Sequence, residues 1–175
     1  MRDRLRDAYA GGDLLNLFCY TALHSVHALK NGMDGAVNID LSGPALRWAR
    51  LNYEENGLAA GEKNFVRGDS LEWIRIFGKK KRRFGLVIFD PPTFSRNRKK
   101  SFSIKRDYAS SLRHVSSIAA GGHVLTCVNT ESISRDEYLS CHPAGWENLF
   151  LVHEPSDFPY SDRPYLKAGL WRVSD

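Results

Sequence analysis

Short apolar runs alternate along the chain with longer stretches in which apolar residues recur every three or four positions. Short apolar runs bounded by turn residues are typical of buried strands, and the longer periodic stretches are typical of helices. The alternation predicts an α/β fold, in which helices cover the faces of a mostly parallel sheet. Strands are expected at residues 14–18, 36–39, 65–66, 84–89 and 123–128, and near 149–152 and 166–173.

Helices are expected between these strands, and some of their ends carry recognisable signals. Ser42 followed by Pro44 favours the start of a helix, and Asn56-Gly57 favours its end. Helices are expected at residues 21–29, 42–56, 71–77 and 103–119, and residues 140–148, including Trp146, are interpreted as a surface connection.

Two consecutive prolines follow a buried strand in the segment Phe89-Asp90-Pro91-Pro92-Thr93-Phe94. Proline fixes φ and offers no N–H, so the strand must stop there and a stiff loop must follow. Asp90 then stands at the carboxyl end of the strand, with Phe94 beside it. An aromatic ring and extended backbone carbonyls can hold a flat heterocycle by stacking and by a hydrogen bond to an amine. The alternative is a tight turn whose acid caps the next helix.

Acidic residues also follow the second and third expected strands, at Asp40 and Asp69. Because parallel strands place their carboxyl ends along one edge of a sheet, both acids should converge there with Asp90. Asp40 is suited to accept both hydroxyls of a ribose, and Asp69 or its neighbouring amide can meet an adenine edge. A helix cap is the alternative role for each acid.

The turn after the first expected strand, residues 16–22, contains no glycine. Dinucleotide-binding proteins need glycines at this turn so that the backbone can approach a pyrophosphate, and the chain has no P-loop either. An adenosine ligand without phosphates fits this turn better, so S-adenosylmethionine is favoured over NAD. Tyr20 either lines such a site or packs against the first helix.

Composition and charge narrow the class of protein. The chain has 175 residues, of which 42% are hydrophobic and 26% charged, so one globular domain over residues 1–175 is expected. No apolar run approaches the roughly 20 residues of a membrane span, and the first residues lack the apolar core of a signal peptide. The three cysteines and six histidines show no metal-ligand spacing. We therefore expect a cytoplasmic protein with reduced thiols, without a metal or membrane partner; its oligomeric state stays open.

The position of the basic residues is more informative than the net charge of +5. Residues 79–83 precede the fourth strand and belong to the amino edge, where a solvated turn is favoured over a remote phosphate contact. A second basic set follows Phe94 and should rim the carboxyl edge, interleaved with Phe94 and Phe102. Cations and stacking surfaces together suit single-stranded or looped RNA. The set is Arg96, Arg98, Lys99, Lys100, Lys105 and Arg106.

With these features in order, the chain resembles the class I S-adenosylmethionine-dependent methyltransferases. Among them it is similar to the bacterial large-subunit ribosomal RNA methyltransferases that modify cytosine at C5 or guanine at N7. The resemblance implies a doubly wound, Rossmann-like α/β fold with a mostly parallel seven-stranded sheet whose final strand is reversed. The matching segments are Leu15–Thr21, Asp40–Ser42, Asn52–Leu58, Phe65–Asp69, Asp90–Phe94 and Tyr165–Lys167.

The resemblance also implies roles for individual residues. The methionine side of the cofactor would meet the turn after the first strand, the ribose would meet Asp40, and the adenine would lie beside Asp69 and Ser70. Asp90 would lie near the methyl-transfer centre, and the prolines with Phe94 would position the target base. The cofactor-binding set is Asn16, Phe18, Tyr20, Thr21, Asp40, Leu41, Ser42, Asp69, Ser70 and Asp90; the catalytic set is Asp90, Pro91, Pro92 and Phe94.

Three departures from the family pattern stand out. The family usually has glycine where this chain has Ala22, and alanine is expected there only if φ stays negative. The family usually carries an RNA-binding domain before the catalytic one, whereas this chain starts close to its first strand, which leaves open a fragment or a separate targeting partner. Members that act on cytosine C5 use a cysteine at the position of Asn129.

The missing cysteine bears on the atom that is methylated. C5 of cytosine reacts only after a thiolate adds at C6, whereas a nitrogen lone pair needs alignment alone. Cys127 shares a strand face with Asn129 but is interpreted as a buried structural residue. A nitrogen acceptor is therefore preferred.

Lys167 follows Tyr165 on a late expected strand. Its side chain contacts either the substrate or a carboxylate, or has a purely structural role.

The leading hypothesis is an S-adenosylmethionine-dependent methyltransferase acting on RNA, most plausibly ribosomal. One alternative is a catalytically degenerate domain that binds nucleic acid or a protein partner, which Ala22 and the missing N-terminal domain motivate. Another is a methyltransferase for a small molecule or a protein, which the basic rim disfavours.

Overall fold

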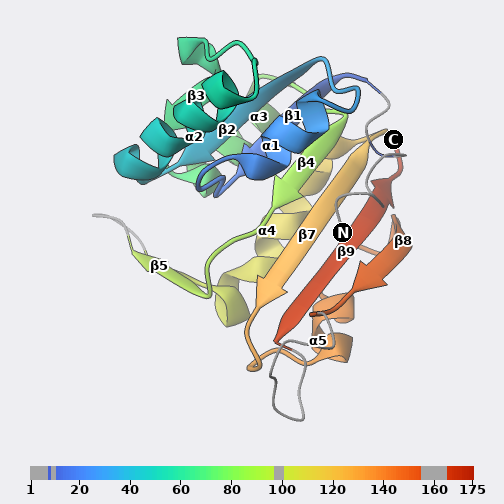
Figure 1. The fold of residues 1–175 in the computed structure, drawn as a ribbon. Coiled ribbons are helices and arrows are strands. Elements are labelled where there is room, and N and C mark those ends of the chain that lie inside the picture. Colours follow the sequence, from blue (N-terminus) through green and yellow to red (C-terminus); the bar gives the residue numbers. More distant parts are fainter. Residues whose placement is uncertain (1–7, 9–10, 97–100, 155–164) are drawn as a thin grey trace.

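Seven strands form the central sheet, in the order β3-β2-β1-β4-β7-β9-β8 (Figure 1). The computed structural model describes residues 8, 11–96, 101–154 and 165–175. The first five strands in this order run parallel, β9 is antiparallel to β7, and β8 is antiparallel to β9. The expected α/β fold with a mostly parallel seven-stranded sheet is thus confirmed. The strands are β1 (Asp13–Leu17), β2 (Gly35–Asp40), β3 (Phe65–Arg67), β4 (Leu86–Phe89), β7 (His123–Asn129), β8 (Trp146–Val152) and β9 (Leu166–Val173).

Helices cover both faces of the sheet. Figure 1 shows α1 and α2 on one face and α3 and α4 on the other. One core layer joins the sheet to α3, α4 and α5, and smaller layers lie beneath α1 and α2. All four side chains of β4 are buried because both faces are covered, which explains its uninterrupted apolar sequence. The helices are α1 (Leu23–Leu29), α2 (Gly43–Glu55), α3 (Ser70–Lys79), α4 (Ile104–Ala119) and α5 (Arg135–Ser140), with the 3₁₀ turn η2 (Glu62–Asn64).

Two of the helices that lead away from the carboxyl edge, α2 and α3, begin at side-chain caps. Oγ of Ser42 accepts a hydrogen bond from Ala45 N at 3.2 Å, and Pro44 lies in the first turn of α2. Asp69 caps α3 by accepting from Leu71 N at 2.9 Å. These caps satisfy N–H groups that have no partner inside the helix. They also place the residues just before each helix at the edge of the sheet where β2 and β3 end.

Two segments differ from the expectations. The loop after β4 contains a small hairpin, β5 (Phe94–Arg96) and β6 (Ser101–Ser103), whose strands pair antiparallel. Residues 140–148 are more than a surface connection, because β8 begins at Trp146 and that side chain is buried. Trp146 packs near Trp171 and donates from Nε1 to Oγ of Ser116 at 3.0 Å. The burial of Trp146 thus depends on contacts with distant parts of the chain.

Among the described residues, no helix is long and apolar enough to span a membrane.

Candidate active site

The carboxyl ends of β1, β2, β4 and β7 surround a cavity of about 380 Å³. This is the edge at which open α/β sheets bind ligands, and the volume is in the range of small-molecule sites. The cavity is lined by Phe18, Tyr20, Asp40, Leu41, Ser42, Ser70, Asp90, Pro91, Pro92, Ser95 and Asn129. Most of the residues expected to bind the cofactor or to catalyse the reaction are therefore brought together.

The turn after β1 is strained. Phe18, Tyr20 and Ala22 have φ angles of 55°, 48° and 55°, the left-handed region that side chains other than glycine rarely adopt. The expectation that Ala22 keeps a negative φ is therefore wrong. Each such conformation costs about 1–2 kcal/mol and persists only where contacts with the surrounding structure hold the backbone in place.

Hydrogen bonds from three other elements hold this turn. The N–H of Phe18 donates to Oγ of Ser70 at 3.0 Å, and the N–H of Tyr20 donates to Oδ2 of Asp40 at 2.9 Å. Nδ2 of Asn52 donates to the carbonyl of Thr21 at 2.8 Å. The strained turn is thus fixed by α3, β2 and α2 together.

Asp40 presents an oriented carboxylate to the cavity. Its Oδ2 accepts from Tyr20 N and its Oδ1 from Ser42 N, at 2.9 and 2.8 Å. A carboxylate offers about four lone-pair sites, so each oxygen keeps capacity for a further donor. The arrangement can accept two adjacent hydroxyls, as a ribose presents them.

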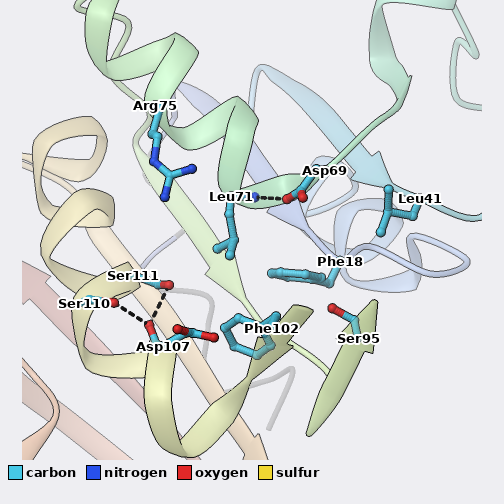
Figure 2. A pocket seen from close by; sticks show the side chains of 10 residues that line it. All are labelled: Phe18, Leu41, Asp69, Leu71, Arg75, Ser95, Phe102, Asp107, Ser110 and Ser111. Atoms are coloured by element: carbon cyan, nitrogen blue, oxygen red, sulfur yellow. Dashed lines mark hydrogen bonds between the residues drawn. The ribbon is translucent and has the colours of Figure 1, made fainter. Parts of the chain in front are cut away.

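A second cavity of about 130 Å³ adjoins the first, since Phe18, Leu41 and Ser95 line both. Figure 2 shows Phe18, Leu71 and Phe102 directed into it, and the rings of Phe18 and Phe102 lie 6.2 Å apart. These apolar side chains form a slot that can enclose a flat ring. The full lining is Phe18, Leu41, Asp69, Leu71, Arg75, Ser95, Phe102, Asp107, Ser110 and Ser111.

The loop after β4 places Asp90 at the wall of the larger cavity. Burial raises the pKa of this carboxyl from 3.8 to about 6, and a hydrogen bond from Asn129 opposes the increase. That bond joins Nδ2 of Asn129 to Oδ1 of Asp90 at 3.2 Å. Pro91 and Pro92 also line the cavity, whereas the side chain of Phe94 is 62% exposed and lines neither cavity. Asp90 can therefore exchange a proton near neutral pH.

Cys127 is buried and lines neither cavity. Its side chain is 2% exposed and packs in the core layer that contains Ile88, Leu125 and Ala168. Burial, and secondarily the charge of Asp90, raise the pKa of this thiol well above its ordinary value. A thiolate is needed for attack on a pyrimidine, so the buried thiol fits the structural role expected from the sequence.

Several expected site residues lie elsewhere. Asn16 is 2% exposed, donates to Oγ of Ser25 at 2.8 Å and lines neither cavity, because its side chain points into the layer beneath α1. Thr21 contributes its carbonyl to the hydrogen bond with Asn52 and also lies outside both cavities. Lys167 is 1% exposed and donates to the carbonyl of Thr130 at 2.6 Å, which favours the structural role.

The structure describes the side chains of two of the six basic residues expected to contact RNA, Lys105 and Arg106. Arg98, Lys99 and Lys100 lie outside the described residues, and only the backbone of Arg96 is described. Lys105 is exposed at the start of α4, and Arg106 forms an ion pair with Asp107 at 2.8 Å. At the opposite edge, Arg82 pairs with Asp13 at 2.9 Å and lies over the ring of Phe84. Its role there is structural.

Several residues of the site are not among those expected from the sequence. Leu71 and Arg75 line the smaller cavity, and Ser95 lines both. Phe102, expected as a stacking surface for RNA, is instead buried and lines the smaller cavity, because its hairpin packs it against Phe18. Leu71 follows the Asp69 cap directly and could have been inferred from that position; Ser95 and Phe102 depend on the hairpin. In the described part of the chain, no cluster of three or more His, Cys, Asp or Glu side chains could hold a metal ion.

Comparison with known proteins agrees with this geometry. The chain is 36% identical over 167 residues to a ribosomal RNA large subunit methyltransferase K/L of Shewanella loihica, covering 93% of this chain and 23% of that protein. A protein of the same name from Pseudomonas aeruginosa is 32% identical over 177 residues, covering 99% of this chain and 23% of that protein. The chain thus spans about a quarter of the length of these relatives.

Solved structures show the same fold. The protein SMU.776, solved in complex with SAH, superposes with a TM-score of 0.87 at 26% identity, covering 98% of this chain and 48% of that one. TrmN of Thermus thermophilus superposes with a TM-score of 0.67 at 18% identity, covering 98% and 47%, a likeness of fold alone.

A family model confirms the resemblance seen in the sequence. The model of the S-adenosylmethionine-dependent methyltransferases matches residues 1–172, almost the entire chain. Together with the cavity at the carboxyl edge, this match shows that the chain belongs to the S-adenosylmethionine-dependent methyltransferase family.

Proposed function

We propose that residues 1–175 act as one methyltransferase domain that transfers a methyl group from S-adenosylmethionine to a nitrogen of a base in large-subunit ribosomal RNA. The observation that carries the proposal is the placement of Asp90 and its two prolines at the wall of the larger of two joined cavities. A ribosomal RNA substrate implies that the protein acts in the cytoplasm.

The cavities suit the cofactor. Asp40 offers acceptors for the ribose diol, and Leu41, Leu71 and Phe18 offer apolar surface for the adenine. Among the described residues, the larger cavity is lined by two carboxylates and by no cation. That charge favours a sulfonium and opposes the pyrophosphate of a dinucleotide. When bound, the cofactor supplies an electrophilic methyl group.

The loop after β4 suits a nitrogen acceptor. Pro91 and Pro92 have no N–H, so they present carbonyls alone, and Asp90 adds a carboxylate. A base with amino or imino hydrogens can donate to these groups while its reacting nitrogen is aligned. The protonated, buried thiol of Cys127 argues against covalent attack on cytosine. The geometry therefore supports direct transfer to nitrogen.

RNA is supported by the names of the relatives and by the surface beside the loop. The relatives above are named as methyltransferases of large-subunit ribosomal RNA. Phe94 precedes the cavity-lining Ser95, and Lys105 lies two residues before the cavity-lining Asp107; both are exposed and can stack on a base and meet a phosphate.

Calorimetric titration of S-adenosylmethionine and S-adenosylhomocysteine, with NAD as control, tests the cofactor. Binding of the two sulfur ligands alone is expected; binding of neither would favour the catalytically degenerate domain. Tritium transfer to ribosomal RNA fragments, followed by nucleoside analysis, tests the substrate and the methylated atom.

Replacing Arg98, Lys99 and Lys100 by alanine tests the RNA-binding set. Weaker RNA binding with a flatter salt dependence is expected, because fewer phosphates would be neutralised. An unchanged salt slope would contradict the assignment of these residues.

A further inference from the structure

Asn129 is the last residue of β7, and it contacts two residues of the loop after β4. Its Nδ2 donates to Oδ1 of Asp90 at 3.2 Å, and its backbone oxygen accepts from Oγ1 of Thr93 at 3.1 Å. Because β7 and β4 are parallel neighbours, both bonds cross from one strand end to the next.

The loop needs such external contacts. Pro91 and Pro92 cannot donate from their backbone, so the loop cannot continue the ladder with β7. Thr93 is held on its other side as well, since its carbonyl accepts from Ile104 N at 3.1 Å. The loop is therefore anchored between the end of β7 and the start of α4.

We propose that Asn129 is a positioning residue for methyl transfer: its side-chain amide orients the Asp90 carboxylate, and its backbone carbonyl anchors the loop through Thr93. This role rests on the function proposed above. It explains why asparagine serves at this position, because the side chain must donate to a carboxylate while leaving an acceptor for another group.

The remaining polar atoms indicate what the site selects. Within the described residues, Oδ2 of Asp90 and Oδ1 of Asn129 have no hydrogen-bond partner, and both residues line the larger cavity. Two such acceptors, beside prolines that offer no N–H, favour a base that presents amino or imino hydrogens. A base edge made only of acceptors would leave these atoms unpaired, which costs binding energy.

Few charged groups surround Asp90. Beneath it on β7, the Cys127 thiol stays protonated because burial raises its pKa. Across the cavity lie the Asp40 carboxylate and the Tyr20 phenol, and no lysine, arginine or histidine of the described chain lines this cavity. Of the side chains that the structure describes, Asn129 alone is seen to donate to Asp90.

The first test uses the unmodified, ligand-free protein. The side-chain amide signals of Asn129 are followed by ¹H–¹⁵N NMR while the pH is varied. They should shift with a midpoint near 6, the pKa of Asp90, and this titration should vanish in the D90N variant. An Asn129 amide that does not respond to Asp90 would overturn the proposal.

The second test removes the donor. Asn129→Leu keeps the side-chain size but cannot donate, so the ¹³C-detected titration of Asp90 should move upward by about one pH unit. The matched control, Thr93→Val, loses the anchor but keeps the Asn129 amide, and its Asp90 midpoint should stay at the wild-type value. An unchanged midpoint in folded N129L would refute the role.

Neither titration needs cofactor or RNA, so their outcome is separate from that of the binding experiments on the proposed function. If the titrations succeed and cofactor binding fails, the link between Asn129 and Asp90 stands without methyl transfer, and the role as a positioning residue falls.

Discussion

The backbone N–H of Tyr20 donates to Oδ2 of Asp40 at 2.9 Å, which ties the left-handed turn after β1 to the acid at the end of β2. The same carboxylate accepts from Ser42 N at 2.8 Å. One side chain thus fixes the shape of the turn and presents oxygens to the cavity.

Asp40→Ala should abolish cofactor binding. A hydrogen bond to a charged group contributes about 1.5–3 kcal/mol, so the loss of two bonds to a ribose should weaken S-adenosylhomocysteine binding by at least about 100-fold. Calorimetry checks this, with Glu147→Ala as control, because Glu147 lies in an exposed ion pair with Arg172. Retained affinity in D40A would show that the ribose binds elsewhere.

Ala22→Gly should be tolerated better than Ala28→Gly. Both alanines are fully buried, but Ala22 has a φ of 55° whereas Ala28 lies within α1. Each change loses a methyl group and loosens the unfolded chain, and only at position 22 does glycine also relieve strain. Urea unfolding should show A22G to be less destabilised by about 1 kcal/mol; equal losses would mean that the turn is not strained.

His142 should make stability depend on pH. Burial lowers the pKa of its imidazole from 6.5 to about 4, and the ring is stacked on Trp171 at 3.7 Å. Between pH 4 and 6.5, His142 binds a proton in the unfolded chain but stays neutral in the folded one. The contribution of His142 to the free energy of unfolding is therefore fully present above pH 6.5 and is lost as the pH falls toward 4, by about 3 kcal/mol.

His142→Gln isolates that contribution. Denaturation of the variant and the wild type is compared at pH 7 and 4.5, and the wild type should lose more stability on acidification. Parallel losses would contradict a buried neutral imidazole. The comparison is necessary because Asp90, with its raised pKa, contributes with the opposite sign.

Asp90→Asn should stabilise the protein at neutral pH and reduce methyl transfer. The folded-state pKa of Asp90 is about 6 rather than 3.8, so its ionisation costs folding energy as the pH rises through that window. D90N removes this cost, about 3 kcal/mol at pH 7.5, and should show little gain at pH 4. Thermal unfolding of D90N and the wild type at both pH values measures the gain in stability. An equal gain at both pH values would indicate a cause other than ionisation of Asp90.

Cys127→Ala should keep methyl transfer. The thiol is buried and protonated, so its loss should leave turnover within a few-fold of the wild type while costing about 1 kcal/mol of stability. Abolished turnover in a folded variant would revive covalent catalysis at cytosine.

Much of the framework could be predicted from local patterns. The apolar run before Asp90 forms β4 and Ser42 caps α2, as their local sequence predicts, and Asp69 forms the helix cap that was the alternative reading of that acid. Parallel strands share an edge, so Asp40 and Asp90 could be placed at one site without coordinates.

The rest depended on contacts between distant segments. Asn16 was expected at the cofactor, but pairing of β1 and packing of α1 direct it to Ser25. The strained φ of Ala22 is imposed by bonds from α2, α3 and β2 around its turn, which no local propensity reveals.

The alternation of strands and helices, the acids at the strand ends and the stiff proline loop are properties of local sequence, because they follow from periodicity, capping and the missing N–H of proline. Which oxygen of Asp40 accepts from Tyr20, that Asn129 contacts Asp90, and that Asn16 turns away from the cavity toward Ser25 emerge only in the folded chain. The physical reason is that hydrogen-bond partners and burial depend on the packing of strands far apart in the chain.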